Sequence, residues 1–180
     1  EALAYVHQLG DDNNGVLLHR DLTPENLIFS LDGRVRLIDF GLARSAANAV
    51  EMTVNLEGKH GFEAPETRTT QVVDARTDLY TVGLTLYRFW TGVDLAPHDE
   101  YLNSLRAFTP QDPIAAELAK VLLKCLAPNP DHRFQSAQTL YSALSQLSDA
   151  YTSQEAQNWL QMAHAPLVRR EESRLTQIFS

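Results

Sequence analysis

The sequence has a single cysteine, Cys125, among its 180 residues. One cysteine excludes an internal disulfide and favours a reducing compartment, so we expect a cytoplasmic protein. Positive charge is also scarce: 15 Lys and Arg residues stand against 23 Asp and Glu residues, for a formal net charge of −8. An acidic surface does not attract a phosphate backbone, so a nucleic-acid partner is disfavoured.

Long hydrophobic runs are absent as well. No stretch of about 18 uncharged apolar residues occurs, so we expect no membrane-spanning helix in this segment. Hydrophobic residues make up 44% and charged residues 21%, which is ordinary for a globular domain with a real core. The sequence starts at Glu1, and "EALAYVHQLG" already has the pattern of the middle of a helix. We therefore expect a fragment cut from a longer chain.

The order of elements predicts a mainly α fold, a helical bundle with one small β-hairpin. Helical periodicity predicts helices over residues 1–9, 78–91, 114–126 and 134–147. Two short strands, "NLIF" and "RVRLI", are joined by "SLDG", and Asp-Gly between apolar runs is a strong hairpin signal. Residues 42–57 have no firm period and are expected to form a long loop. In the helix predicted over 78–91, the residues expected on one broad apolar face are Leu79, Val82, Leu86, Phe89 and Trp90.

Three polar residues around the hairpin suggest phosphoryl transfer. Asp21 and Asn26 lie in a polar loop before the hairpin, and Asp39 follows it. Phosphoryl transfer needs a carboxylate to orient the attacking hydroxyl and accept its proton. It also needs hard oxygen ligands for a magnesium ion that neutralises the phosphates. We expect Asp21 to be the base and Asn26 and Asp39 to be the metal ligands.

At this point the sequence resembles the C-terminal lobe of a eukaryotic-type (Hanks-type) serine/threonine protein kinase, over about residues 1–148. The motifs that carry the resemblance occur in the family's order: "HRDLTPEN" at 19–26, "DFG" at 39–41, "GKHGFEAPE" at 58–66, "DLYTVG" at 78–83 and "PDHRFQSA" at 130–137. One motif alone would be weak, but five in order are very specific. The fold implied is the helical lobe of the α+β kinase fold, and the reaction implied is transfer of the ATP γ-phosphate to a protein hydroxyl.

The resemblance also implies roles for residues around the site. Asp39, Phe40 and Gly41 resemble the magnesium-binding loop, and with Asn26 they would help to bind the cofactors ATP and Mg²⁺. Arg20 marks kinases whose activation loop is ordered by phosphorylation, and Thr53 and Ser45 are the candidate phosphorylation sites.

Four further residues are expected to be structural. His19 is expected to be a packed, hydrogen-bonded core histidine rather than a base. Asp78 is expected both to cap its helix and to brace the catalytic-loop backbone. Glu66 and Arg133 are expected to form a buried ion pair.

The sequence departs from the family at two positions. Serine/threonine kinases usually carry lysine where this chain has Thr23, and threonine where it has Lys59. We hypothesise a swap, in which the Lys59 ammonium reaches the site from the other side and supplies the missing charge. The alternative is that Lys59 points to solvent and the enzyme is slow or inactive.

The family's N-terminal lobe, with its glycine-rich loop and strand lysine, is not in this sequence. We expect it earlier in the same parent chain, and we expect the isolated fragment to be inactive. Residues 149–180 would be a helical tail or a linker to a further domain. Two alternatives stay open: a pseudokinase that acts as a scaffold, and a small-molecule kinase such as an antibiotic phosphotransferase, against which the "APE" and "DLYTVG" motifs weigh.

Overall fold

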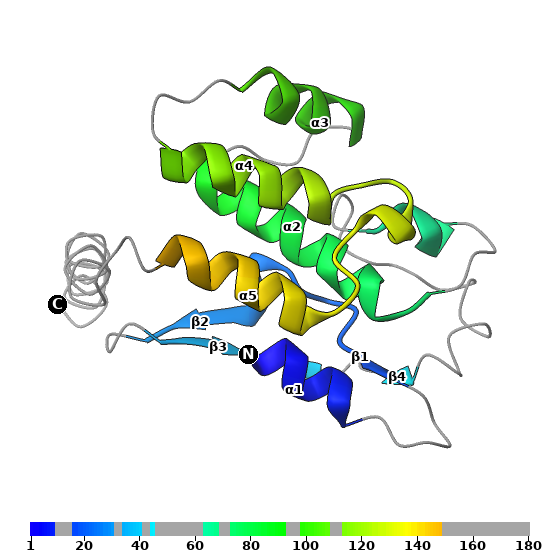
Figure 1. Cartoon of the computed structure of the whole chain (residues 1–180). Coiled ribbons are helices and arrows are strands. Elements are labelled where there is room, and N and C mark those ends of the chain that lie inside the picture. The colour runs from blue at the N-terminus through cyan, green and yellow to red at the C-terminus, as the bar shows by residue number, and fades with distance from the viewer. Residues whose placement is uncertain are drawn as a thin grey trace, which may run out of the picture.

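The computed structural model describes residues 1–9, 16–30, 34–40, 44–45, 63–68, 73–92, 98–108 and 113–148. Within these ranges the fold is mainly helical (Figure 1). The α-helices are α1 (Ala2–Gln8), α2 (Ala75–Thr91), α3 (His98–Ala107), α4 (Pro113–Cys125) and α5 (Ala137–Ser148). Three short 3₁₀ turns, η1 (Pro24–Asn26), η4 (Pro65–Arg68) and η5 (Pro130–His132), lie between them. Among the described residues, none of the helices has the length and hydrophobicity of a membrane-spanning segment.

In the described part of the chain, four short strands form two separate antiparallel pairs. The predicted hairpin is β2 (Leu27–Phe29) with β3 (Val35–Leu37), in which Leu27 lies opposite Leu37. Its end is closed by the Ser30 N–H, which donates to the Arg34 carbonyl at 2.8 Å. The second pair joins β1 (Leu17–Leu18) to β4 (Arg44–Ser45). β4 falls within the stretch 42–57 that the sequence predicted to be loop, so that prediction was wrong for these two residues.

Helix α2 runs through the middle of the fold, with α4 on one side and α5 and the strands on the other (Figure 1). Asp74 caps it: the carboxylate accepts the Arg76 backbone N–H at 2.8 Å. Asp78 therefore lies in the first turn of α2 and is not its cap, because the helix begins one turn before the predicted start. At the other end Gly92 adopts φ 67°, a left-handed conformation that glycine tolerates and that ends the helix.

The buried side of α2 differs from the predicted apolar face. Leu79 is fully buried as expected, but Phe89 is 47% exposed. Polar residues of α2 are buried instead: Thr77, Thr81 and Thr85 are each no more than 5% exposed, and Asp78 is 1% exposed. Apolar periodicity missed them, because a buried polar side chain is stable only when another segment supplies a hydrogen-bond partner, and those partners lie far away in the sequence.

The hydrophobic core lies between α2, α4 and α5. Gly83 of α2 allows a close approach to α4, since a Cβ built on it would lie 2.6 Å from the Cβ of Cys125. Core positions of α3 are Leu102 and Leu105, at 4% and 3% exposure. The sequence reading did not predict α3, although the spacing of these two leucines was a usable signal. The close packing of α2 against α4 holds α2 next to the polar loop that follows β1.

Candidate active site

The polar loop after β1 is held by Asp78 of α2. One carboxylate oxygen of Asp78, Oδ1, accepts the backbone N–H of Arg20 at 2.9 Å. The other, Oδ2, accepts the backbone N–H of His19 at 2.9 Å. Asp78 thus braces the loop directly before Asp21, as the resemblance implied.

The brace fixes an unusual backbone conformation. Arg20 has φ 70°, in the left-handed region that costs a non-glycine residue of the order of 1–3 kcal/mol. Asp39 has φ 61°, so both carboxylate-bearing turns of the candidate site contain a left-handed residue. Such residues persist only where surrounding contacts impose them, and at Arg20 the hydrogen bond from its own N–H to Asp78 is such a contact.

His19 links the loop to the segment that carries Asp39. Its side chain is fully buried, its Nδ1 accepts the Asp21 backbone N–H at 3.3 Å, and its Nε2 lies 3.2 Å from the Ile38 carbonyl. Because a backbone N–H only donates and a carbonyl only accepts, this pattern fits a neutral imidazole with its proton on Nε2. The Phe40 ring packs edge-on against His19, with ring centroids 4.7 Å apart.

Asp21 and Asn26 are in direct contact. The Asn26 Nδ2 donates to the Asp21 carboxylate oxygen Oδ2 and to the Asp21 carbonyl, both at 2.7 Å. The Asn26 carbonyl accepts the Ile38 backbone N–H at 3.0 Å, which places Asn26 beside the residue that precedes Asp39. Asn26 is buried, Asp21 is half-buried and Asp39 is exposed. Asp21 and Asn26 are therefore hydrogen-bonded to each other, and the backbone contact of Asn26 with Ile38 brings the chain position of Asp39 to the same end of the hairpin.

Asn26 and Asp39 offer the oxygen donors that a hard divalent cation prefers. Both contacts from Asn26 to Asp21 use its Nδ2, so they leave the side-chain oxygen Oδ1 for another partner. Asp39 contributes an exposed carboxylate. Mg²⁺ is bound in proteins through one or two carboxylates, amide oxygens and waters, so the donor set fits that ion.

Thr23 lies inside the loop and not on its surface. It is 1% exposed, and its carbonyl accepts the Asn26 N–H at 3.0 Å, which closes the 3₁₀ turn η1. The adjacent Leu22 carbonyl accepts a hydrogen bond from the Thr85 hydroxyl of α2. The loop is thus hydrogen-bonded to α2 through both Asp78 and Thr85. A short neutral side chain at position 23 supplies no positive charge to the site.

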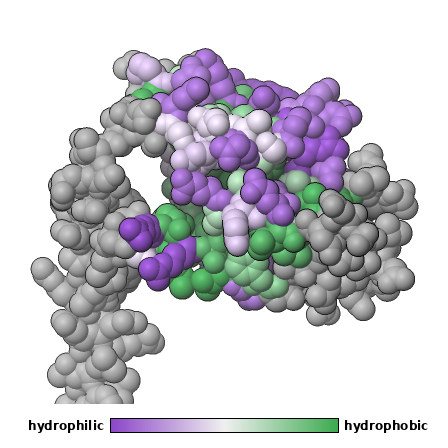
Figure 2. Space-filling model, turned by 60° about the horizontal axis from the view of Figure 1, so that its bottom comes forward, coloured by the Kyte–Doolittle hydropathy of each residue, from purple (hydrophilic) through white to green (hydrophobic). Residues whose placement is uncertain are grey.

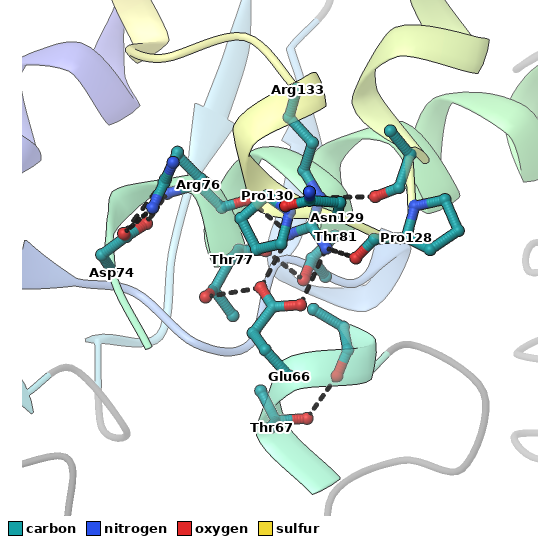
Figure 3. Close-up of polar contacts among 12 residues, drawn as sticks. Glu66, Thr67, Asp74, Arg76, Thr77, Thr81, Pro128, Asn129, Pro130 and Arg133 are labelled. Carbon is teal, nitrogen blue, oxygen red and sulfur yellow. Dashed lines mark hydrogen bonds and ion pairs between the residues drawn. The ribbon is translucent and has the colours of Figure 1, made fainter. Parts of the chain in front are cut away.

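Glu66 and Arg133 are brought together as a buried, bidentate ion pair (Figure 3). Two guanidinium nitrogens of Arg133 each donate to one Glu66 oxygen at 2.7 Å, and both residues are at most 2% exposed. The Thr77 hydroxyl donates to the Glu66 oxygen Oε1 at 2.9 Å. The pair therefore joins η4, α2 and the segment after α4.

Several predicted residues lie outside the described part of the chain. These are Gly41, Lys59 and Thr53. Ser45 lies in β4, where its backbone pairs with Leu17. Nothing in the described residues bears on the proposed exchange of Thr23 and Lys59.

One residue of the site was missed from the sequence. His7, in the helix predicted over residues 1–9, places its ring Nε2 2.8 Å from the Asp78 oxygen Oδ2. Its side chain is 8% exposed. The contact joins residues 71 positions apart, so no local pattern predicts it.

Comparison with known proteins agrees with this geometry. The family model described as "Protein kinase domain" matches residues 1–145. Serine/threonine-protein kinase PknB of Mycolicibacterium smegmatis is 34% identical over 149 residues, covering 76% of this chain and 23% of the relative. PknB of Mycobacterium tuberculosis gives the same identity and coverage. A probable serine/threonine-protein kinase of Streptomyces coelicolor is 32% identical over 151 residues, covering 76% of this chain and 21% of the relative.

The chain thus spans about a quarter of the length of the relatives it matches. The match covers the loop, the hairpin and every described helix of the core up to residue 145. The resemblance seen in the five sequence motifs is therefore confirmed by comparison over most of the chain. The chain belongs to the Hanks-type protein kinase family.

Proposed function

We propose that this chain is the catalytic C-terminal lobe of a serine/threonine protein kinase, which transfers the γ-phosphate of ATP to a protein hydroxyl. The observation that carries the proposal is the contact between Asp21 and Asn26 at 2.7 Å, in a loop braced by Asp78. A carboxylate held in this way is suited to orient a substrate hydroxyl. Family membership and the serine/threonine kinases among its relatives support the same reaction.

Asp21 is the proposed base. It accepts the proton of the substrate hydroxyl as the hydroxyl oxygen bonds to the γ-phosphorus, and the bond from that phosphorus to the ADP oxygen breaks. Asn26 uses its amide N–H to hold one oxygen of Asp21, which leaves the second oxygen for the hydroxyl. Asn26 Oδ1 and Asp39 would hold Mg²⁺, which when bound neutralises the charge on the phosphates.

The remaining half of the ATP site is proposed to come from an N-terminal lobe in the same parent chain. The hairpin and the residues beside it expose large apolar side chains. They are Ile28, Phe29, Val35, Ile38, Phe40 and Phe89, each between 38% and 52% exposed. Part of the hydrophobic surface on the lower side of the molecule is visible in Figure 2. An apolar patch of this kind is usual where another domain or a ligand binds. The 180 residues alone are therefore expected to bind ATP poorly.

The charge missing at Thr23 is proposed to come from Lys59. Thr23 is buried and neutral, so a positive charge for the transferred phosphate must come from another segment. Loss of one charge-stabilising group commonly lowers kcat by about 10²-fold. The Lys59→Ala variant is expected to lose activity on that scale, and unchanged turnover would refute the exchange. Phosphorylation of Thr53 in the active protein is a separate proposal, and mass spectrometry that finds only unmodified Thr53 would remove it.

The experiment that tests the function uses the full-length protein that contains this chain. ATP-dependent phosphorylation of a generic protein substrate, and of the protein itself, is measured with the Asp21→Asn variant as control. General-base catalysis contributes about 10²–10⁴-fold, so the variant is expected to lose activity by that factor. The alternative, a pseudokinase scaffold, is motivated by the buried Thr23. It predicts no phosphate transfer by the unmodified protein under any condition.

A further inference from the structure

Helix α1 carries an apolar stripe on its solvent side, which we call the α1 stripe. Its members are Ala2, Tyr5 and Leu9, whose spacing places them on one face of the helix. All three are exposed, with Tyr5 at 65% and Leu9 at 54%. The core-facing side of the same helix carries Ala4 and Val6, at 8% and 5% exposure. The α1 stripe therefore takes no part in the packing of the core.

The apolar surface continues from α1 onto α5. The two helices pack against each other (Figure 1). The Tyr141 hydroxyl of α5 donates to Glu1 Oε1 at 2.8 Å, and the Glu1 carbonyl accepts the Tyr5 backbone N–H at 3.0 Å. Tyr141 is itself 37% exposed, so it adds to the surface that the α1 stripe begins. Aromatic and aliphatic side chains gathered over two helices are typical of a surface that binds another protein segment.

The sequence after α5 contains a segment that fits this surface. Residues 149–180 follow Ser148, the last residue of α5, and lie outside the described part of the chain. Four apolar residues of this segment are spaced at i, i+3, i+4 and i+7: Ala156, Trp159, Leu160 and Ala163. This spacing predicts a helix with one apolar face, and Pro166 predicts its end. A tryptophan on such a face is the kind of side chain that anchors a protein contact.

The segment is close enough along the chain to reach the α1 stripe. At about 1.5 Å per residue, Tyr141 lies about 10 Å back along α5 from Ser148. Residues 149–158, which connect Ser148 to Trp159, would span about 33 Å when extended. A segment on so short a tether has an effective concentration in the millimolar range. The tether therefore favours this segment over a partner that must come from solution.

We propose that residues 154–165 dock their apolar face on the α1 stripe and on Tyr141, with Trp159 as the anchor against Tyr5 and Leu9. Docking removes the exposed apolar side chains of α1 from water, which is the driving force for the contact. The surface includes no residue of the candidate active site. The inference therefore holds whether or not the protein transfers phosphate.

The test compares three variants of the full-length protein that contains this chain. The double variant Tyr5→Ser with Leu9→Ser removes the α1 stripe. Trp159→Ser removes the anchor, and it lies outside residues 1–145, which match the kinase family, so it leaves the core intact. Phe108→Ser is the matched control, because Phe108 is also an exposed apolar residue, at 43%, and follows α3 on the opposite side of the fold from α1 (Figure 1).

The first measurement is amide hydrogen exchange over residues 154–165, followed by mass spectrometry. In the parent protein these amides are expected to exchange at least about tenfold more slowly than in an unprotected chain. The stripe variant and Trp159→Ser are both expected to lose this protection. Phe108→Ser is expected to keep it.

The second measurement locates the contact by photo-crosslinking. The probe is p-benzoylphenylalanine in place of Leu160, which keeps Trp159 intact. Irradiation is expected to join position 160 to a peptide that contains Tyr5 and Leu9 or to one that contains Tyr141. The mass of the product shows whether the link lies within one chain or between two.

Each result decides for or against the docking. Residues 154–165 without protection in the parent, or protection that survives in the stripe variant, would overturn the inference. Equal loss of protection in Phe108→Ser would overturn it as well. Cross-links between two chains would assign the surface to a second copy, and cross-links only to other regions would place the segment elsewhere; both results contradict the proposal. If the stripe variant does not fold, Trp159→Ser and the cross-links still decide.

Discussion

The buried pair of Glu66 and Arg133 supports a quantitative prediction for stability. The substitution Glu66→Gln keeps the side-chain size but removes the negative charge opposite a guanidinium whose side chain is 0% exposed. Arg133 would retain hydrogen bonds to the carbonyls of Ala127, Pro128 and Arg76, at 2.8, 3.1 and 3.1 Å. Carbonyl dipoles do not replace a full negative charge, so the variant is expected to lose the stability that a buried cation loses when its counter-ion is removed.

Breaking a buried ion pair by removing one partner costs about 3–5 kcal/mol. For a domain of 150–250 residues, each kcal/mol lowers Tm by about 2–4 °C. Multiplying this loss of stability by the change in Tm per kcal/mol, we expect Glu66→Gln to unfold about 6–20 °C below the parent. Thermal and urea unfolding of the protein containing this chain, followed by far-ultraviolet circular dichroism, measure the change.

The matched control lies three residues earlier in the sequence. Glu63 forms an ion pair with Arg68 at 2.9 Å, in which the Arg68 side chain is 65% exposed. Exposed pairs contribute about 0–1 kcal/mol, so Glu63→Gln is expected to leave Tm almost unchanged. A double-mutant cycle with Arg133→Met completes the test, since the double variant leaves no stranded charge. Glu66→Gln within about 1 kcal/mol of the parent, or strictly additive single effects, would refute the reasoning.

Three further predictions follow from single contacts. Gly83→Ala is expected to destabilise the fold by about 1–3 kcal/mol in urea unfolding, because the new Cβ would lie 2.6 Å from Cys125 Cβ. Burial raises the pKa of the Cys125 thiol to about 12, so the native protein should resist alkylation by iodoacetamide at pH 8, and rapid labelling would contradict the buried placement. Burial alone would raise the pKa of Asp74, but hydrogen bonds from Arg76 outweigh it and lower the pKa. Because the pKa of Asp74 is lower in the folded state, its carboxylate contributes stability above pH 3.8, and this contribution is lost as the pH falls through the folded pKa. The Asp74→Asn variant keeps the helix cap. The parent should therefore be slightly more stable than this variant at pH 7, and the difference in free energy of unfolding should vanish in acid. A difference that does not change with pH would contradict the ion pair.

Local rules in the sequence were enough to predict the hairpin and the loop before it. Asp-Gly between two apolar runs predicted β2 and β3, and the structure pairs them with Leu27 opposite Leu37. β4 was missed because a two-residue strand has no pattern of its own. It exists through its pairing with β1, in which Leu17 lies opposite Ser45. Such a strand is defined by its partner, and the partner is about 28 residues away along the chain.

The start of α2 shows how a local rule selects the wrong residue. Two aspartates, Asp74 and Asp78, lie one turn apart, and either fits the rule that an acidic residue caps a helix. The sequence reading placed the cap at Asp78, where the apolar run begins. The helix starts earlier, since Asp74 accepts the Arg76 N–H, and this leaves Asp78 free to accept donors from the loop.

The sequence was enough to predict which residues form the candidate site, but not the contacts that hold them in place. Asp21, Asn26 and Asp39 stand out because their chemistry and spacing match a known motif. The loop around them is also supported by ordinary helix residues: His7 contacts Asp78 over 71 positions, and Thr85 donates to the Leu22 carbonyl over 63 positions. Apolar periodicity does not predict either contact, because it contains no information about which distant group needs a hydrogen-bond donor.

The contacts between α2 and the loop have a consequence for the proposed catalysis. Helix α2 can hold the loop only if it is itself fixed, and the absence of a side chain at Gly83 allows it to pack closely against α4. From that fixed helix, Asp78 and Thr85 reach two points of the loop, on either side of Asp21. Substitutions at these two positions should therefore change kcat without touching the substrate, while substitutions in the core of α2 should change stability first. The position of Asp21, the proposed base, thus depends on the helix packing as well as on the motif that contains it.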